Sequence, residues 1–235
     1  IVTLGKYGAN TFDYLEWSTR FSLKKARRIV AISNFTKQEL MKAYQASQDK
    51  VTVIYNGYAK EIYHPLPDSS ESQEIIHRYG IKPPYFFYIG RLDKKKNITT
   101  LIEGFARFKQ RQGSNFKHHL CLVGDASFGF DEVKYTIDQY NLSNDIIMTG
   151  WVKEEDVPHI FARADAFVFP SYYEGFGIPL LQAMATETPI AASRAASIPE
   201  VVGEAALLFD PKNSEEIALC LDQIATDHSV RDSLV

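Results

Sequence analysis

Short apolar runs alternate with longer amphipathic segments along most of this chain. The runs hold four or five consecutive aromatic, aliphatic or β-branched residues between Gly, Pro and polar positions, as at 85–89 and 166–170. A strand that is covered on both faces is continuously apolar, whereas a helix on the surface of a sheet repeats its apolar residues with a period of about 3.6. The pattern therefore predicts an α/β fold with a parallel sheet and helices on both faces.

The pattern also gives the order of the elements. The predicted strands of the sheet are 85–89, 119–123, 146–149, 166–170, 189–192 and 206–208. The predicted helices around it are 71–79, 98–112, 131–140, 154–164, 177–187 and 214–226. Two further strands, 29–32 and 51–54, flank a helix near 35–46 and precede a stretch rich in Pro and Ser at 57–70. That composition is typical of a linker, so it predicts a domain boundary there.

Composition excludes several classes of protein. The chain has 235 residues, 45% of them hydrophobic, and a net charge of −3, which does not suit a general nucleic-acid binder. No apolar run approaches the ~20 residues of a transmembrane helix. Cys121 and Cys220 both lie in apolar runs, as expected for reduced core residues. We therefore expect a cytoplasmic protein.

A basic segment at 20–28 leaves two interpretations open. Its cations surround Phe21 and Leu23 and are Arg20, Lys24, Lys25, Arg27 and Arg28. They can form a solvated helix face before the first strand. Alternatively, they can contact anionic lipid head groups, which would place the protein peripherally at the inner face of the membrane.

A candidate anion site follows the run at 166–170. The chain turns there through Gly175 and Gly177 into a helical pattern. A strand, a glycine turn and a helix N-terminus together present free N–H groups and a positive helix end to a phosphate. Glu174 precedes the turn, and its carboxylate suits sugar hydroxyls better than a phosphate, which it would repel.

A second candidate site is the loop after 85–89. Arg91 and Lys96 follow that strand through Gly90. Because both cations lie in one loop, their charged groups can bind the same anion. The planar guanidinium of Arg91 and the compact ammonium of Lys96 together suit a diphosphate. Lys94 and Lys95 are adjacent, so a surface cluster of charges is the alternative. The histidines fit no metal spacing, so we predict no metal and no cofactor.

Several motifs occur in order along the chain. They are V-I-Y-N-G at 53–57, G-R-L-D-K-K-K-N at 90–97, E-G-F-G-I-P-L-L-Q-A-M-A at 174–185 and S-I-P-E-V-V-G-E-A-A at 197–206. Together they resemble the retaining glycosyltransferases of family 4, from about residue 26 to the last residue. The resemblance implies a GT-B type, Rossmann-like fold. It makes 1–58 the C-terminal part of an N-terminal, acceptor-side domain, and 59–235 a nucleotide-sugar donor-binding domain truncated at its C-terminus. Since the chain begins at Ile1, we interpret it as a fragment.

The resemblance also implies roles for individual residues. Arg91 and Lys96 would hold the donor's diphosphate, and Glu174 would bind the hydroxyls of the donor sugar. The backbone N–H groups of Phe176 and Gly177 would contact the donor as well. The complete set of expected donor-binding residues is Gly90, Arg91, Lys96, Gly150, Trp151, Val152, Glu174, Gly175, Phe176, Gly177, Ile178 and Gln182.

Three of these assignments have alternatives. Trp151 or Val152 could pack on the nucleotide base, or Trp151 could belong to the core. Glu174 could merely cap a helix. Gln182 stands where the family has a second glutamate, which binds the ribose diol; it could make a weaker neutral hydrogen bond there, or none. Glu187 also departs from the family, which usually has a glycine at that position.

The function implied is a metal-independent retaining hexosyltransferase, similar to a mannosyltransferase of polysaccharide or lipopolysaccharide biosynthesis. Its nucleotide-sugar co-substrate would donate to a glycan or lipid-linked acceptor. The similarity of 166–211 to bacterial mannosyltransferases favours GDP-mannose only slightly over a UDP-sugar. Two alternatives remain, a nucleotide-sugar binding module without transfer activity and a GT-B epimerase or phosphorylase.

Overall fold

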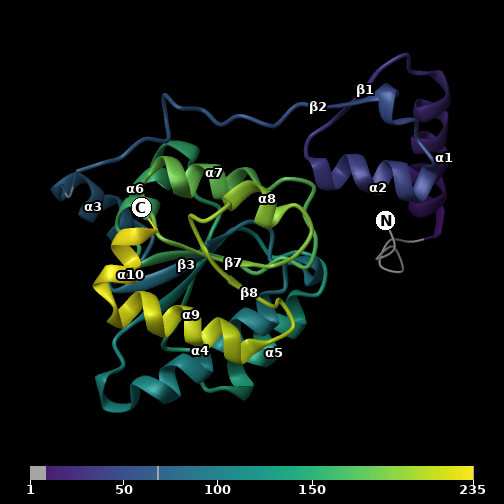
Figure 1. The fold of residues 1–235 in the computed structure, drawn as a ribbon. Helices are drawn as coiled ribbons and strands as arrows, with labels where there is room; N and C mark the ends of the chain where they lie inside the picture. Colours follow the sequence, from purple (N-terminus) through teal and green to yellow (C-terminus); the bar gives the residue numbers. More distant parts are fainter. Residues whose placement is uncertain (1–8, 68, 235) are drawn as a thin grey trace. The chain divides into compact units, whose positions relative to one another are not determined.

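The computed structural model describes residues 9–67 and 69–234, and it divides the chain into two compact units, Ile1–Asn56 and Gly57–Val235 (Figure 1). The first unit contains helix α1 (Ala9–Lys25), strand β1 (Ile29–Ala31), helix α2 (Asn34–Tyr44), a 3-10 turn η2 (Gln48–Lys50) and strand β2 (Val51–Val53). β1 and β2 pair in parallel. Ser33 is the N-cap of α2, and its hydroxyl accepts a hydrogen bond from the Thr36 backbone N–H at 3.0 Å.

The predicted basic segment begins in the last turns of α1. Arg20 forms an ion pair with Glu16 at 2.7 Å, and the remaining cations of the segment are exposed. Three large aromatic side chains of α1 are also exposed, namely Tyr14 at 64%, Trp17 at 61% and Phe21 at 49%. The rings of Trp17 and Phe21 stack with centroids 5.4 Å apart. This helix therefore carries aromatic and cationic side chains that are open to solvent within the first unit.

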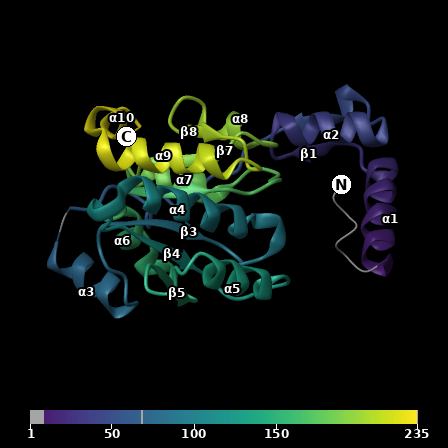
Figure 2. The ribbon, with the colours of Figure 1, turned by 90° about the horizontal axis from the view of Figure 1, so that it is seen from below.

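The second unit is built on one parallel sheet of six strands. They are β3 (Tyr85–Ile89), β4 (His119–Val123), β5 (Ile146–Gly150), β6 (Ala166–Phe169), β7 (Ile190–Ser193) and β8 (Leu207–Phe209). Their order in the sheet is β5-β4-β3-β6-β7-β8. Figure 2 labels β8 and β7 on one side of β3 and β4 and β5 on the other. The sequence predicted each strand to within one residue at either end, because each is a continuous apolar run bounded by polar or glycine positions.

Helices cover both faces of this sheet, as predicted, and Figure 1 shows α6, α7 and α8 on one side and α4, α5 and α9 on the other. Their bounds are α3 (Ser70–Arg78), α4 (Ile98–Gln112), α5 (Phe130–Gln139), α6 (Val157–Ala162), α7 (Ile178–Ala185), α8 (Ile198–Val202), α9 (Ser214–Thr226) and α10 (His228–Ser233). Alternate residues of β3 enter opposite cores: Phe86 and Tyr88 pack with α4 and α9, while Tyr85 and Phe87 pack with α6. This alternation follows from the period of two along a strand.

Some predicted elements differ from the observed ones. The predicted helix 154–164 is a 3-10 turn, η5 (Glu154–Asp156), followed by the short helix α6. Pro158, which has no backbone N–H, lies in the first turn of α6, where that donor is not needed. The helices α8 and α10 were not predicted, because five or six residues show too little periodicity. Cys121 and Cys220 are free and buried, which confirms their interpretation as reduced core residues.

Candidate functional site

The candidate site lies at the carboxyl edge of the sheet, where the strand order changes direction. From β3 the chain adds β4 and then β5 on one side, and it returns to add β6 on the other side of β3. The loops that follow β3 and β6 therefore leave the sheet side by side. In open α/β sheets this switch point is where ligands bind. The loops that carry Arg91, Lys96 and Glu174 are these two.

A pocket of about 420 Å³ opens beside the loop that follows β3. Its lining comes from the ends of β3, β4 and β5 and comprises Ile89, Gly90, Arg91, Val123, Gly124, Asp125, Ala126, Ser127, Trp151 and Val152. Four of the residues expected from the sequence, Gly90, Arg91, Trp151 and Val152, therefore share one cavity. Its size suits part of a nucleotide.

Trp151 and Val152 have different environments in this pocket. The Trp151 side chain is 68% exposed, so the alternative that it belongs to the core is wrong. Val152 is buried and packs in the core beneath the pocket. An exposed indole at the rim of a pocket is a suitable surface on which a flat aromatic ring can stack.

The Arg91 loop is fixed by contacts of its backbone. The Tyr88 hydroxyl donates a hydrogen bond to the Arg91 carbonyl oxygen at 3.0 Å. Burial raises the pKa of Tyr88 far above its usual range, so this hydroxyl stays protonated and remains a donor. The backbone N–H of Gly90 donates to Val123 O, and that of Gly124 donates to Gly150 O, both at 2.9 Å. The three strand ends that line the pocket are thus tied to one another.

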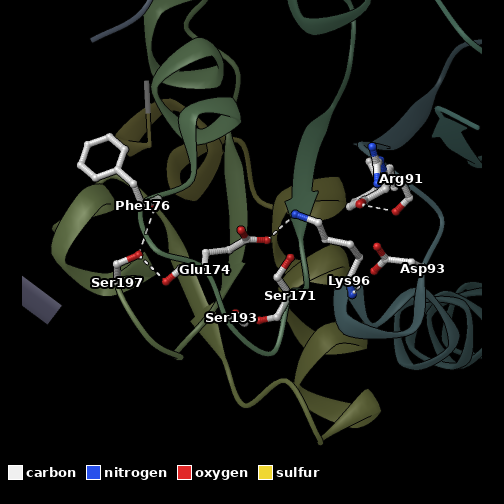
Figure 3. Close-up of polar contacts among 9 residues, drawn as sticks. Arg91, Asp93, Lys96, Ser171, Glu174, Phe176, Ser193 and Ser197 are labelled. Atoms are coloured by element: carbon white, nitrogen blue, oxygen red, sulfur yellow. Dashed lines mark hydrogen bonds and ion pairs between the residues drawn. The ribbon is translucent and has the colours of Figure 1, made fainter. Parts of the chain in front are cut away.

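Lys96 and Glu174 form an ion pair in which Lys96 Nζ lies 2.6 Å from Glu174 Oε1 (Figure 3). Both side chains are largely shielded, with exposures of 19% and 17%. The ammonium group also lies 5.8 Å from the centroid of the Phe169 ring. Arg91 does not take part in this pair, and in Figure 3 its side chain lies apart from it. The structure therefore brings Lys96 to Glu174 and leaves Arg91 at the neighbouring pocket.

Two polar residues hold Lys96 in this position. Asp93 is the N-cap of the 3-10 turn η3 (Lys94–Lys96), and its carboxylate accepts from the Lys96 backbone N–H at 3.2 Å. The buried side-chain amide of Asn97 donates to Pro170 O at 3.0 Å and to Pro211 O at 2.6 Å. Asn97 therefore joins the loop after β3 to the loop after β6. Sequence reasoning missed this role, because an Asn after three lysines resembles a surface residue.

The loop that carries Glu174 is held from the opposite side. The Ser197 hydroxyl lies 3.0 Å from Glu174 O and 3.2 Å from Phe176 O, and it can donate to either (Figure 3). Ser193 Oγ donates to Ser171 O at 2.6 Å. Phe176 is buried, so the loop is anchored by a side chain as well as by hydrogen bonds. The backbone on both sides of the carboxylate is thus well defined.

The glycine turn leads directly into helix α7. Gly177 is the N-cap with φ +103°, a conformation that favours glycine, and α7 begins at Ile178. The first N–H groups of this eight-residue helix follow Glu174 by only a few residues, as the sequence predicted. Gln182 lies in the second turn and is half-buried, whereas the Ile178 side chain is exposed. The N-cap of α7 is Gly177, which has no side chain with which to cap the helix. The interpretation of Glu174 as a helix cap stays an alternative beside its ion pair with Lys96.

Within the described residues, no group of three or more His, Cys, Asp or Glu side chains is close enough together to hold a metal ion. Besides the exposed Lys94 and Lys95, the positive charge at the two loops comes from Arg91, Lys96 and the N-terminus of α7. A ligand with negative charge is therefore the chemistry that this arrangement suits.

Two family models together match nearly all of the chain. The model described as "Glycosyl transferases group 1" matches residues 71–235, and that of "Glycosyltransferase Family 4" matches residues 4–61. The chain belongs to the glycosyl transferases group 1 family. Its fold is the GT-B type of α/β fold, as the resemblance implied. The O-antigen chain mannosyltransferase B of Escherichia coli is 29% identical over 93% of this chain and 57% of its own length.

Other relatives of this glycosyltransferase-family chain are more distant. The mannosylfructose-phosphate synthase of Agrobacterium fabrum is 26% identical over 82% of this chain and 44% of its own length. A solved structure of Anabaena Alr3699/HepE with UDP and glucose has a TM-score of 0.82 and 24% identity, covering 94% of this chain and 59% of that one. The chain thus spans about half the length of the curated relatives it matches.

Proposed function

We propose that this protein is a glycosyltransferase that moves a sugar from a nucleotide-sugar donor to a glycan or lipid-linked acceptor, with retention of anomeric configuration. The observation that carries the proposal is the ion pair between Lys96 and Glu174 at 2.6 Å, beside the pocket that Arg91 lines. It places a cation suited to a phosphate next to a carboxylate suited to sugar hydroxyls. A nucleotide sugar contains both groups, joined directly.

The donor would extend from the pocket to the glycine turn. Its base would stack on Trp151 and its ribose would approach Gln182, while the diphosphate would lie between Arg91, Lys96 and the N-terminus of α7. The sugar would then meet Glu174. The names of curated relatives support mannose as the sugar, and the UDP bound by the Anabaena protein supports a UDP-sugar as the alternative donor.

The mechanism assigned to this site begins with departure of the nucleoside diphosphate. Negative charge grows on the leaving diphosphate as the anomeric bond breaks. Arg91, Lys96 and the helix end stabilise that charge more than they stabilise the bound donor, so they lower the barrier. The sugar becomes similar to an oxocarbenium ion. The acceptor hydroxyl attacks on the face that the leaving group vacates, and its proton passes to the departing diphosphate.

A nucleotide-sugar binding module without transfer activity is the second candidate. It is favoured by the neutral Gln182 in the second turn of α7, where the family has a carboxylate. Binding of a nucleotide sugar without turnover in the presence of varied acceptors would support this candidate.

The test is a calorimetric titration of the chain and of its Arg91→Ala/Lys96→Ala variant. Each protein is titrated with GDP and UDP and with the corresponding nucleosides. The double substitution is expected to weaken diphosphate binding by about 3 kcal/mol, since it removes two charged hydrogen-bonding groups, and to leave nucleoside binding unchanged. Lys94→Ala/Lys95→Ala is the matched control, because it removes the same charge from exposed neighbours. Equal losses for diphosphate and nucleoside would reject the assignment.

We also propose that the exposed aromatic and basic side chains of α1 contact an anionic membrane surface. No described helix has both the length and the apolar character needed to cross a bilayer. In a Trp151→Phe background Trp17 is the only tryptophan of the chain, and its fluorescence then reports such contact directly. Vesicles of anionic lipid are expected to shift its emission to the blue and neutral vesicles are not; equal responses would contradict the proposal.

A further inference from the structure

Glu174 brings a negative charge to the position where the site needs positive charge. Its carboxylate is hydrogen-bonded to Lys96 Nζ at 2.6 Å, and both side chains are more than four-fifths shielded from water. A shielded pair interacts more strongly than a pair on the surface, because less solvent screens it. A phosphate that binds Lys96 must therefore share that ammonium group with Glu174.

The surrounding contacts hold the two partners in place. The Glu174 carbonyl is within hydrogen-bonding distance of Ser197 Oγ, and the backbone N–H of Lys96 is capped by Asp93. Both backbone segments are fixed, so Glu174 has only its own rotamers with which to move away from a bound ligand. Glu174 and a bound phosphate therefore compete for Lys96.

Two ligands of the proposed reaction differ in the way they meet this carboxylate. A nucleotide sugar presents hydroxyl groups, which donate hydrogen bonds to Glu174 and compensate for its partial loss of Lys96. A free nucleoside diphosphate presents a terminal, anhydride-linked phosphate instead, which carries roughly −1.5 to −2 charges at pH 7, as other terminal phosphate groups do. It has no hydroxyl at that position and repels the carboxylate.

We propose that Glu174 selects against the nucleoside diphosphate product by competing with its terminal phosphate for Lys96. This inference rests on the proposed function, since it assumes that the diphosphate lies at Lys96. The carboxylate then has a role besides holding the sugar. Once the sugar has left, Glu174 recovers Lys96 and speeds the release of the diphosphate. Arg91 lies outside the ion pair, so it continues to hold the nucleotide of the donor.

The experiment compares the chain with its Glu174→Gln variant by calorimetric titration of GDP, UDP, GDP-mannose and UDP-glucose. The substitution keeps the shape of the side chain and removes the charge. The nucleoside diphosphate that binds is expected to bind about tenfold more tightly, or ~1.4 kcal/mol, while its nucleotide sugar binds no more tightly. Glu187→Gln is the matched control, because it removes the same charge from an exposed residue just beyond α7. It is expected to change neither affinity.

The outcomes separate this inference from the proposed function. Diphosphate binding that is unchanged or weaker in Glu174→Gln would overturn the inference and leave the proposed function standing. An equal gain in affinity for the diphosphate and for the nucleotide sugar would also overturn it, because removal of the negative charge would then favour both anionic ligands alike. If the unaltered chain bound none of the four ligands, the proposed function would fail and the inference with it. Glu174→Ala, which also lacks the charge, must shift the ratio of the two affinities in the same direction.

Discussion

The backbone oxygen of Gly90 lies so close to Gly124 that a Cβ atom on Gly124 would be 2.2 Å from it. The two glycines follow the neighbouring strands β3 and β4, and both line the pocket. Gly124 also has φ +132°, which is unfavourable for any other residue. The close approach of these two loops therefore shapes the pocket and fixes the start of the segment that carries Arg91.

Gly124→Ala is expected to destabilise the protein by about 3 kcal/mol, the sum of backbone strain and overpacking. It should also weaken binding of a nucleoside diphosphate, because relief of the clash moves Gly90 and Arg91. Urea unfolding and calorimetry measure the two effects. Gly80→Ala is the control: Gly80 also has a positive φ, +71°, but no atom near its missing side chain. If the free energy of unfolding falls equally in both variants, the clash with Gly90 does not contribute to the loss of stability.

Glu174 and Gln182 are expected to contribute unequally to turnover. Glu174→Gln should raise the barrier to sugar transfer by roughly 2–4 kcal/mol, as loss of a single electrostatic contact does elsewhere. Gln182→Glu should tighten donor binding by about 1 kcal/mol, the value of a gained charged hydrogen bond. Single-turnover measurements with a matched acceptor exclude product release from the rate. Normal single-turnover rates in Glu174→Gln would show that the carboxylate does not meet the donor sugar.

Replacement of Glu187 by glycine is expected to stabilise the protein by about 1 kcal/mol, because Glu187 has a left-handed backbone with φ +54°. The side chain is exposed, so little packing is lost. Thermal and urea unfolding give the free energy change. Glu187→Ala keeps the unfavourable backbone and serves as the control. A similar gain in that variant would attribute the effect to the lost charge instead of the backbone.

Removal of divalent ions is expected to leave donor binding unchanged, because Arg91, Lys96 and the N-terminus of α7 supply the positive charge. Calorimetric titration of the nucleotide sugar is performed with excess chelator and again with Mg²⁺ or Mn²⁺. Monovalent salt at matched ionic strength is the control for screening. Binding that disappears with chelator and returns with the metal would contradict this expectation.

The sequence predicted the sheet well and the contacts across the site poorly. Each strand, such as β3, is a local apolar run, so its position depends on residues next to one another. The ion pair of Lys96 with Glu174 joins residues 78 positions apart, and it exists only because β6 pairs beside β3. The role of Asn97 could not be predicted either, because the two carbonyl groups to which it donates belong to loops that are distant in the sequence. The sequence indicated the chemistry of Lys96 and Glu174, but it did not show that the two side chains lie next to each other.

The pairing of β3 with β6 joins two halves of the sheet, and this arrangement affects how long the protein stays folded. Lys96 belongs to the stretch that forms β3, β4 and β5, and Glu174 to the stretch that forms β6, β7 and β8. A donor that binds both residues links the two stretches, so β3 and β6 cannot separate unless the donor dissociates first. Resistance to local opening, and to any protease that attacks the opened sheet, therefore rises with the supply of nucleotide sugar.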